Sequence, residues 1–339
     1  MKKSILILSL LLVLVLTVLV ACHNDDTTAS ETTHNPAIDA PATAEEVRIL
    51  ALKGPTGMGL ANVINDAKLD ESSRYSCEIM AGPDLVKTEV LLGNYDIAAL
   101  PTNVAAALYN TKKADFVIAA VNTLGVLYVV ENGETVTDIQ SLKGKTINAT
   151  GQGSTPEYIL RFVLKENGID PDKDVTLDFS YTEHAELAAH VKSGTVSIAV
   201  LPEPQVTSAI MGESNARVAL NLTEEWDKVS DSDVMQGCII VRREFAEQYP
   251  EQLQEFLDAY RASVQFVNEN VEAAATIIAN LGIIPKAELA KAAIPRCNIV
   301  YVDGEEMKQS LTGFFTVLYE ANPASVGGKV PDEALYYQK

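Results

Sequence analysis

The sequence predicts an α/β protein with two lobes. Three observations support this prediction: strand-like and helix-like segments alternate from residue 47, the alternation falls into two sets, and a continuous apolar run connects the sets in each direction. Alternation of this kind is typical of parallel strands with covering helices. We therefore expect an open parallel sheet in each lobe.

The first set of elements follows residue 47. Its strands are expected at 47–52, 76–80, 96–100 and 116–121, and its helices at 59–67, 85–92 and 103–109. The second set begins after Gly144. Its strands are expected at 146–149, 175–179, 197–201 and 218–220, and its helices at 156–167, 183–192 and 204–211. Helices should fill almost all of residues 244–319.

Two apolar runs, 125–130 and 237–241, connect the sets and are interpreted as buried crossing strands. One lobe is then inserted in the other. We expect residues 47–124 and 238–339 in the first lobe and residues 125–237 in the second. Two crossing strands suit a hinge, because only a few residues need to change φ and ψ.

The N-terminal segment has the pattern of a lipoprotein leader. Two lysines precede an apolar run over residues 5–20, and Ala21 is followed by Cys22. This pattern predicts a signal peptide over residues 1–21. It also predicts lipidation of Cys22, with acyl chains such as palmitate holding the protein at the extracytoplasmic face of the cell membrane. A transmembrane anchor is the alternative, disfavoured because acidic residues follow at once.

Residues 22–46 are rich in Asp, Thr, Ala, Glu and Pro and have no apolar periodicity, so we expect a flexible tether. The whole chain has 26 basic and 46 acidic residues among 339, a net charge of −20. Loss of Lys2 and Lys3 with the leader leaves 24 against 46, or −22. Nucleic acids need a basic surface on their partner, so we expect no nucleic-acid binding.

No pattern of cysteine and histidine predicts a metal or cofactor site. Beyond Cys22 the cysteines are Cys77, Cys238 and Cys297, odd in number and widely spaced. This is neither a disulfide framework nor a zinc pattern. No serine or cysteine stands with a histidine in a catalytic arrangement. We therefore expect no metal, no cofactor and no catalytic residue.

Ligands of open α/β sheets bind beyond the carboxyl ends of the strands, so the loops after strands are the candidate contacts. The first loop, residues 54–59, reads GPTGMG and matches neither the P-loop nor the dinucleotide fingerprint. We expect Thr56, Gly57 and Met58 to contact the ligand, because glycines let it approach the backbone N–H groups. The alternative is a tight strand–helix turn that Thr56 caps.

Further polar residues follow the other strands of the first lobe. Thr102 and Asn103 come after the third strand, and they can cap a helix as well as bind a ligand. Asn122 comes after the fourth strand. Gln236 precedes the exit run and offers both a donor and an acceptor.

In the second lobe, residues 150–157 combine glycines, hydroxyls and a proline, which predicts a helix N-terminus beside Ser154 and Thr155. Exposed N–H groups and the positive end of the helix dipole suit a sulfonate, carboxylate or phosphate. Glu157, in the first turn, partly takes that role itself. This segment is the best candidate for an anion site.

Three other side chains of the second lobe are singled out. Tyr181 is the aromatic residue best placed to stack on a ring-shaped ligand. Glu203, between two prolines, is expected either to receive a ligand amine or to cap its own helix. Trp226, the single tryptophan, is expected to pack between the lobes.

The order of these motifs resembles a known family. The leader is followed by GPTGMG at 54–59, GNYDIA at 93–98, GQGST at 151–155 and LPEP at 201–204. Over residues 47 to about 320 the chain resembles the substrate-binding lipoproteins of ABC importers for nitrate, taurine, alkanesulfonates and thiamine-pyrimidine precursors. The resemblance implies a type II periplasmic-binding-protein fold, with two Rossmann-like lobes joined by a two-strand hinge.

The resemblance also implies a function and partners. A permease and an ATPase subunit would receive a small organic solute, either sulfonate-like or a pyrimidine or aromatic precursor. The alternative is an enzyme on the same fold that acts in pyrimidine or thiamine-precursor metabolism. Such relatives use a cysteine-rich motif that is missing from this sequence, so we expect a binding protein and not an enzyme.

Overall fold

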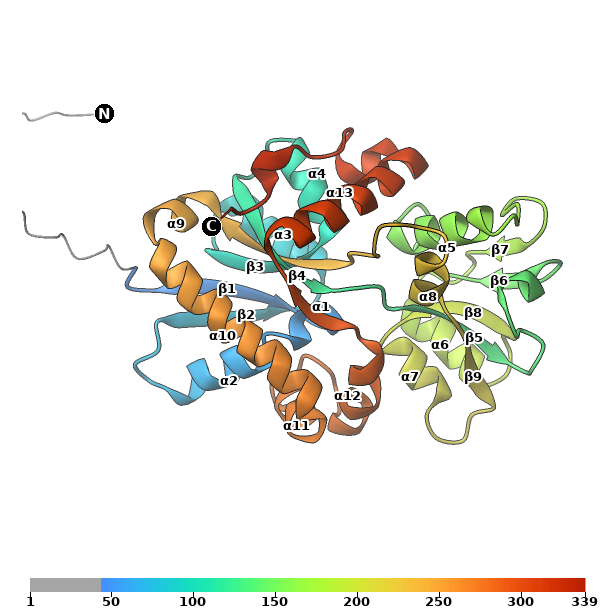
Figure 1. Cartoon of the computed structure of the whole chain (residues 1–339). Coiled ribbons are helices and arrows are strands. Elements are labelled where there is room, and N and C mark those ends of the chain that lie inside the picture. The colour runs from blue at the N-terminus through green and yellow to red at the C-terminus, as the bar shows by residue number, and fades with distance from the viewer. Residues whose placement is uncertain (1–43, 339) are drawn as a thin grey trace, which may run out of the picture. The chain divides into compact units, whose positions relative to one another are not determined.

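The computed structural model describes residues 44–338, in which the chain builds two β-sheets (Figure 1). The predicted signal peptide, the lipidation at Cys22 and all but the last residues of the predicted tether lie outside the described residues, so they stay predictions. Within residues 44–338, no helix has both the length and the apolar character needed to cross a bilayer.

The first sheet has the strand order β11-β4-β10-β3-β1-β2. The strands are β1 (Val47–Leu52), β2 (Tyr75–Met80), β3 (Ile97–Pro101), β4 (Phe116–Thr123), β10 (Gly237–Arg242) and β11 (Ile299–Val302). Strand β1 is parallel to β2 and β3, whereas β10 is antiparallel to both β3 and β4. We call this sheet and the helices on it the first lobe.

The second sheet has the order β7-β6-β8-β5-β9. Its strands are β5 (Leu127–Asn132), β6 (Thr146–Asn148), β7 (Thr176–Asp178), β8 (Ile198–Pro202) and β9 (Ala216–Asn221). Strands β6, β7 and β8 are parallel, and β5 is antiparallel to β8 and β9. We call this sheet and its helices the second lobe.

Helices fill the connections between the strands (Figure 1). In the first lobe they are α1 (Pro55–Met58), α2 (Ala61–Leu69), α3 (Pro83–Leu92), α4 (Thr102–Asn110), α9 (Arg243–Gln248), α10 (Pro250–Glu269), α11 (Val271–Asn280), α12 (Ala287–Ala293) and α13 (Gly304–Ala321). In the second lobe they are α5 (Thr155–Glu166), α6 (His184–Lys192), α7 (Gln205–Ile210) and α8 (Leu222–Asp227).

Both faces of the first sheet are covered by helices, which explains its continuous apolar strands. In β1, Ile49 and Ala51 face the core under α2, α10 and α11, whereas Leu50 and Leu52 face the core under α3, α4 and α13. Side chains alternate along a strand, so a strand with helices on both sides has buried apolar side chains on both faces. The alternating α/β pattern of the sequence is therefore confirmed as a fold with helices on both sides of its sheets.

Two expectations about strands are corrected. The runs at 125–130 and 237–241 do form strands, but each belongs to one sheet and is antiparallel to its neighbours there. Each enters its sheet from the other lobe, beside the carboxyl ends of the parallel strands, and so must run the opposite way. The segment from 244 to 319 was expected to be almost all helical and contains β11 as well.

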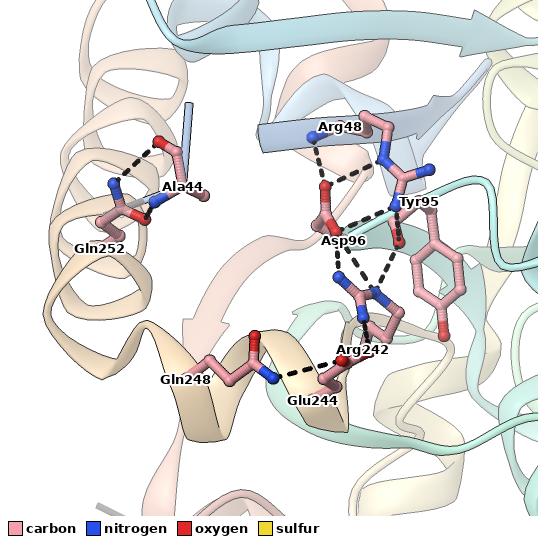
Figure 2. Close-up of polar contacts among 8 residues, drawn as sticks. All are labelled: Ala44, Arg48, Tyr95, Asp96, Arg242, Glu244, Gln248 and Gln252. Carbon is pink, nitrogen blue, oxygen red and sulfur yellow. Dashed lines mark hydrogen bonds and ion pairs between the residues drawn. The ribbon is translucent and has the colours of Figure 1, made fainter. Parts of the chain in front are cut away.

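A buried aspartate joins the amino ends of β1 and β3 to the end of β10 (Figure 2). The carboxylate of Asp96 accepts hydrogen bonds from the backbone and guanidinium of Arg48 and from the guanidinium of Arg242. Burial raises the pKa of Asp96, but the hydrogen bonds from Arg48 and Arg242 outweigh it and hold the pKa below its ordinary value. The cross-link is therefore present at neutral pH and lost as the pH falls through that lowered pKa.

Trp226 packs between the lobes, as the sequence predicts. Its side chain is fully buried, with its ring centroid 4.2 Å from that of Phe162 on α5 and 5.8 Å from that of Phe314 on α13. A single apolar core runs through this contact and includes residues of both sheets. The two lobes are thus packed together beside the crossing segments.

The glycines of the first loop have a reason different from the one expected. A Cβ at Gly57 would lie 1.8 Å from the Leu52 carbonyl oxygen, and a Cβ at Gly59 would lie 2.8 Å from the Tyr260 hydroxyl. The N–H of Gly57 also donates to the Gly54 carbonyl, at 3.1 Å. The need for glycine at these two positions is therefore explained by packing inside the protein, and the predicted ligand contact of Gly57 stays a prediction.

This packing predicts that Gly57→Ala destabilises the fold. The new methyl group must displace the end of β1, at a cost of about 1–3 kcal/mol or more. Gly82→Ala is the control, because a Cβ at Gly82 meets no atom within 4 Å, and it should change stability by less than about 0.5 kcal/mol. Urea denaturation measures both variants. Equal stability of the two would contradict the packing explanation.

Candidate functional site

The candidate site consists of the loops beyond the carboxyl ends of the parallel strands, where both crossing segments also lie. In the first lobe these loops follow β1, β3 and β4, and in the second lobe they follow β6, β7 and β8. The structure shows the surroundings of each predicted site residue, and its contact with a ligand stays a prediction. We describe the hydrogen bonds and burial of these residues in turn.

Thr56 and Asn122 meet in the first lobe. The Asn122 amide donates to the Thr56 carbonyl at 3.1 Å, and its oxygen accepts from the Thr123 hydroxyl at 2.9 Å. A Cβ at Gly237 would lie 2.4 Å from the Asn122 oxygen and 3.1 Å from the Thr56 side chain. Asn122 is thus a buried residue that fixes the loop, whereas Thr56 is half-buried.

The next group joins the loop after β3 to the exit crossing. The Thr102 hydroxyl donates to the Met235 carbonyl, and the Thr102 N–H donates to the Gln236 carbonyl at 3.1 Å. The side-chain oxygen of Gln236 accepts from Val126 N–H at 3.3 Å. Met58 is fully buried, and Asn103 is half-buried in the first turn of α4. The structure therefore brings Thr56, Thr102, Asn122 and Gln236 into one hydrogen-bonded region.

The N-terminus of α5 is only partly satisfied. The Ser154 hydroxyl donates to the Gly151 carbonyl at 2.5 Å and does not cap the helix. The Glu157 carboxylate accepts from Gly153 N–H at 2.6 Å, so it occupies part of the expected anion site. The Thr155 hydroxyl is buried and has no hydrogen-bond partner in the part of the chain that the structure describes.

An unsatisfied buried hydroxyl is a cost to the fold. Thr155 is 8 % exposed, so water satisfies it poorly. It lies in the first turn of a 12-residue helix whose N-cap side chain makes no capping bond. A ligand group that accepts hydrogen bonds would satisfy both the hydroxyl and the helix N-terminus.

His184 belongs to this region and was not predicted as a site residue. Its Nδ1 lies within hydrogen-bonding distance of the buried Thr150 hydroxyl in the loop before α5. Burial lowers the pKa of His184, and the charge of Glu183 opposes this only in part. The imidazole is therefore neutral at pH 7. The sequence signal that could have indicated His184 is its position at the start of α6, the helix that follows β7.

Tyr181 is not a free stacking surface. Its ring centroid lies 4.8 Å from that of His190 on α6, with the planes tilted by 43°. The ring is half-buried in the core under α6 and α7. A flat ligand would therefore meet a tyrosine ring that already packs on one side.

Glu203 caps its own helix and carries an ion pair. Its carboxylate accepts from Thr207 N–H at 3.1 Å and from the Thr207 hydroxyl at 2.9 Å. Arg296, from the first lobe, donates its Nε–H to the same carboxylate at 2.5 Å. These bonds are those expected of the capping alternative, and the predicted ligand contact of Glu203 stays a prediction. Arg296 could not be predicted, because it lies 93 positions away.

Thiols and metal ligands do not gather at the site. Within residues 44–338, no group of three His, Cys, Asp or Glu side chains could hold a metal ion. Burial raises the pKa of Cys77 to about 11 and raises that of Cys238 and Cys297 further. These cysteines are therefore protonated and unreactive at neutral pH.

The fold is that of periplasmic binding proteins, as comparisons with solved structures show. An ABC transporter structure from Parabacteroides distasonis is 25% identical, with a TM-score of 0.75 over 87% of this chain and 100% of that one. The aliphatic sulphonate binding protein of Escherichia coli is 19% identical, with a TM-score of 0.68 over 87% and 93%. The nitrate-binding protein of Synechocystis PCC 6803 is 14% identical, with a TM-score of 0.56 over 83% and 82%.

A sequence-family model gives the family directly. The model of the NMT1-like family matches residues 81–282, which is more than half of the chain. The protein therefore belongs to the NMT1-like family. A search of curated proteins finds no match.

The unsatisfied hydroxyl predicts an unusual effect of Thr155→Val. The substitution keeps the shape and removes the buried polar group, so the unliganded protein should gain about 1 kcal/mol of stability. A ligand bound at α5 should lose one hydrogen bond and about two- to tenfold in affinity. Thermal denaturation and calorimetric titration measure the two effects.

Ser154→Ala is the matched control for stability. It removes a hydroxyl that donates to the Gly151 carbonyl, so it should destabilise the protein. If Thr155→Val destabilises as much as Ser154→Ala, the Thr155 hydroxyl has a partner in the unliganded protein.

Proposed function

We propose that this protein is an extracytoplasmic solute-binding lipoprotein that delivers a small organic molecule to an ABC importer. Its membership of the NMT1-like family supports the proposal. So does its fold, which it shares with an ABC transporter protein and with binding proteins for sulphonate and nitrate. The partners are then a membrane permease and an ATPase, and the two lobes close on the solute about the crossing segments.

The observation that supports this choice of ligand class is the buried hydroxyl of Thr155, at the N-terminus of α5, which has no hydrogen-bond partner within residues 44–338. Hydroxyl and N–H groups are donors, and the helix dipole adds positive potential. They favour a small molecule with a sulfonate or carboxylate group. The half-buried Thr56 hydroxyl in the first lobe would add a second contact.

An enzyme on the same fold is the weaker alternative. Such a role in pyrimidine or thiamine-precursor chemistry would need a nucleophile, a general base or a metal. Cys238 and Cys297 are buried thiols with raised pKa, Cys77 is half-buried and also has a raised pKa, and His184 is hydrogen-bonded to a threonine. No observation favours a reaction over binding.

Thermal-shift measurements with ethanesulfonate, taurine, nitrate, benzoate and cytosine test the ligand class. A sulfonate or carboxylate at about 100 times its dissociation constant should stabilise the protein by about 2.7 kcal/mol, and cytosine should not. Stabilisation by cytosine alone would overturn the assignment of an acidic ligand. Conversion of a bound compound into a product would overturn the binding-protein proposal itself.

The lipid anchor is tested separately. Intact-mass analysis of membrane-extracted protein should give a chain that begins at Cys22 and carries a diacylglyceryl-sized addition. A Cys22→Ala variant should lose this addition and keep its apolar leader. A secreted chain with an unmodified N-terminus at another residue would contradict lipidation.

A further inference from the structure

We propose that Arg296 and Asn298 are positioning residues, which hold the two lobes at the angle where the two halves of the candidate site face each other. The stretch 296–298, here called the clamp segment, leads into β11 of the first lobe. Its contacts with the second lobe and with the first crossing segment carry the proposal. The proposal deepens the proposed function, on which it rests.

The side chain of Arg296 binds the second lobe directly. Its Nε–H donates to Glu203 at 2.5 Å, and its Nη2 donates to the Thr207 hydroxyl and to the Ala292 carbonyl at 3.1 Å. The side chain of Glu203 is completely buried, while that of Arg296 is 29% exposed. Figure 1 shows α12 and α7 side by side, and in the sequence Glu203 comes just before α7 and Arg296 just after α12.

The backbone of the clamp segment makes a second set of bonds. The Tyr128 hydroxyl, from β5, donates to the Arg296 carbonyl at 2.8 Å. The N–H of Leu124 donates to the Asn298 carbonyl at 3.0 Å, and the Asn298 amide donates to the Gly125 carbonyl. The first crossing segment is thus bonded to Asn298 of the first lobe at two successive residues, Leu124 and Gly125.

The local conformation of both partners fits this role. Asn298 has a left-handed backbone, with φ of 44°, a conformation that asparagine tolerates better than most residues. A Cβ at Gly125 would lie 2.1 Å from the Thr223 hydroxyl oxygen. There is therefore no room for a side chain at position 125. The Gly125 carbonyl accepts its hydrogen bond from the Asn298 amide at this tightly packed position.

The clamp segment connects to the candidate site through the crossing segment. Leu124 and Gly125 directly follow Asn122 and Thr123, whose side chains are bonded to each other. Val126 N–H donates to the Gln236 side chain, and the Glu203 N–H donates to the Val126 carbonyl at 3.0 Å. A rotation of the second lobe must therefore disturb the bonds of Arg296, Asn298 and Gln236 together.

A second contact between the lobes, at Trp226, has a different character. It is formed mainly by aromatic rings of α5, α8 and α13. Two hydrogen bonds accompany them, from the Asn322 amide to the Tyr158 hydroxyl at 2.7 Å and from the Ser310 hydroxyl to the Asp233 carboxylate at 3.1 Å. Apolar contacts are not directional. The angle between the lobes is therefore set mainly by the directional bonds of the clamp segment.

Two variants test the proposal. The double variant Arg296→Met/Glu203→Gln removes the ion pair without leaving a buried charge, which would itself unfold the protein. Asn298→Gly removes the amide and keeps the left-handed backbone easy to form. Arg243→Met is the matched control, because Arg243 is 28% exposed and donates to Asp115, Phe116 and Ala334, all in the first lobe.

Amide hydrogen exchange in the full chain, without ligand, is the first measurement. Exchange over residues 124–130 and 203–207 should speed up about two- to tenfold for each hydrogen bond lost in the two variants. Exchange in β1 should not change. The control Arg243→Met should leave residues 124–130 and 203–207 unchanged. Unchanged exchange there in both test variants, or an equal increase in the control, would overturn the proposal.

Titration with ethanesulfonate is the second measurement. Both test variants should bind it at least about twofold more weakly, and Arg243→Met should bind it normally. Normal affinity in the test variants, although exchange has sped up, would show that the clamp does not position the site. If the unaltered protein does not bind ethanesulfonate, that ligand assignment fails, while hydrogen exchange still decides the clamp.

Discussion

The structure depends on one constraint: two sheets that each bury both faces are connected by only two crossings of the chain. Both crossings lie at the carboxyl ends of the parallel strands, which is also where an open α/β sheet binds its ligand. The candidate site therefore cannot be separated from the geometry of the crossings. Asn122 and Gln236 illustrate this, because each holds a loop of the site and a crossing segment at once.

Most buried polar groups around these crossings have partners. Asn122 uses its amide and its oxygen inside the protein, and Glu203 is bonded to Thr207 and Arg296. Groups with internal partners of this kind hold the shape of the loops around the candidate site. The hydroxyl of Thr155 differs from them, because it is buried and has no hydrogen-bond partner among the residues that the structure describes. A site built from such a group is kept at some cost to stability, which is typical of functional positions.

The electrostatics of the site are those of dipoles more than of ions. Arg296 is committed to Glu203, and the Glu157 carboxylate already lies against the N-terminus of α5. The other groups of these loops include hydroxyls, backbone N–H groups, His184 and the exposed Lys53 after β1. Such groups recognise an acidic head group by the positions of its oxygen atoms, and a protein with a net charge of −20 gains little from long-range attraction of anions.

The sequence by itself determined the α/β class and most helices and strands, because these follow from the local hydrophobic period and from the glycines and prolines that end each element. It also located the loops of the candidate site. It also pointed correctly to Trp226 as a contact between the lobes. Only the tertiary structure decided the antiparallel entry of β5 and β10, the strand β11 and the reason for Gly57. Each depends on atoms far apart in the sequence: the clash at Gly57 arises only when α1 folds back on β1, and Arg296 reaches Glu203 across 93 positions. Local sequence patterns do not show contacts between residues far apart in the chain. Only the folded structure therefore shows which polar side chains already have hydrogen-bond partners inside the protein.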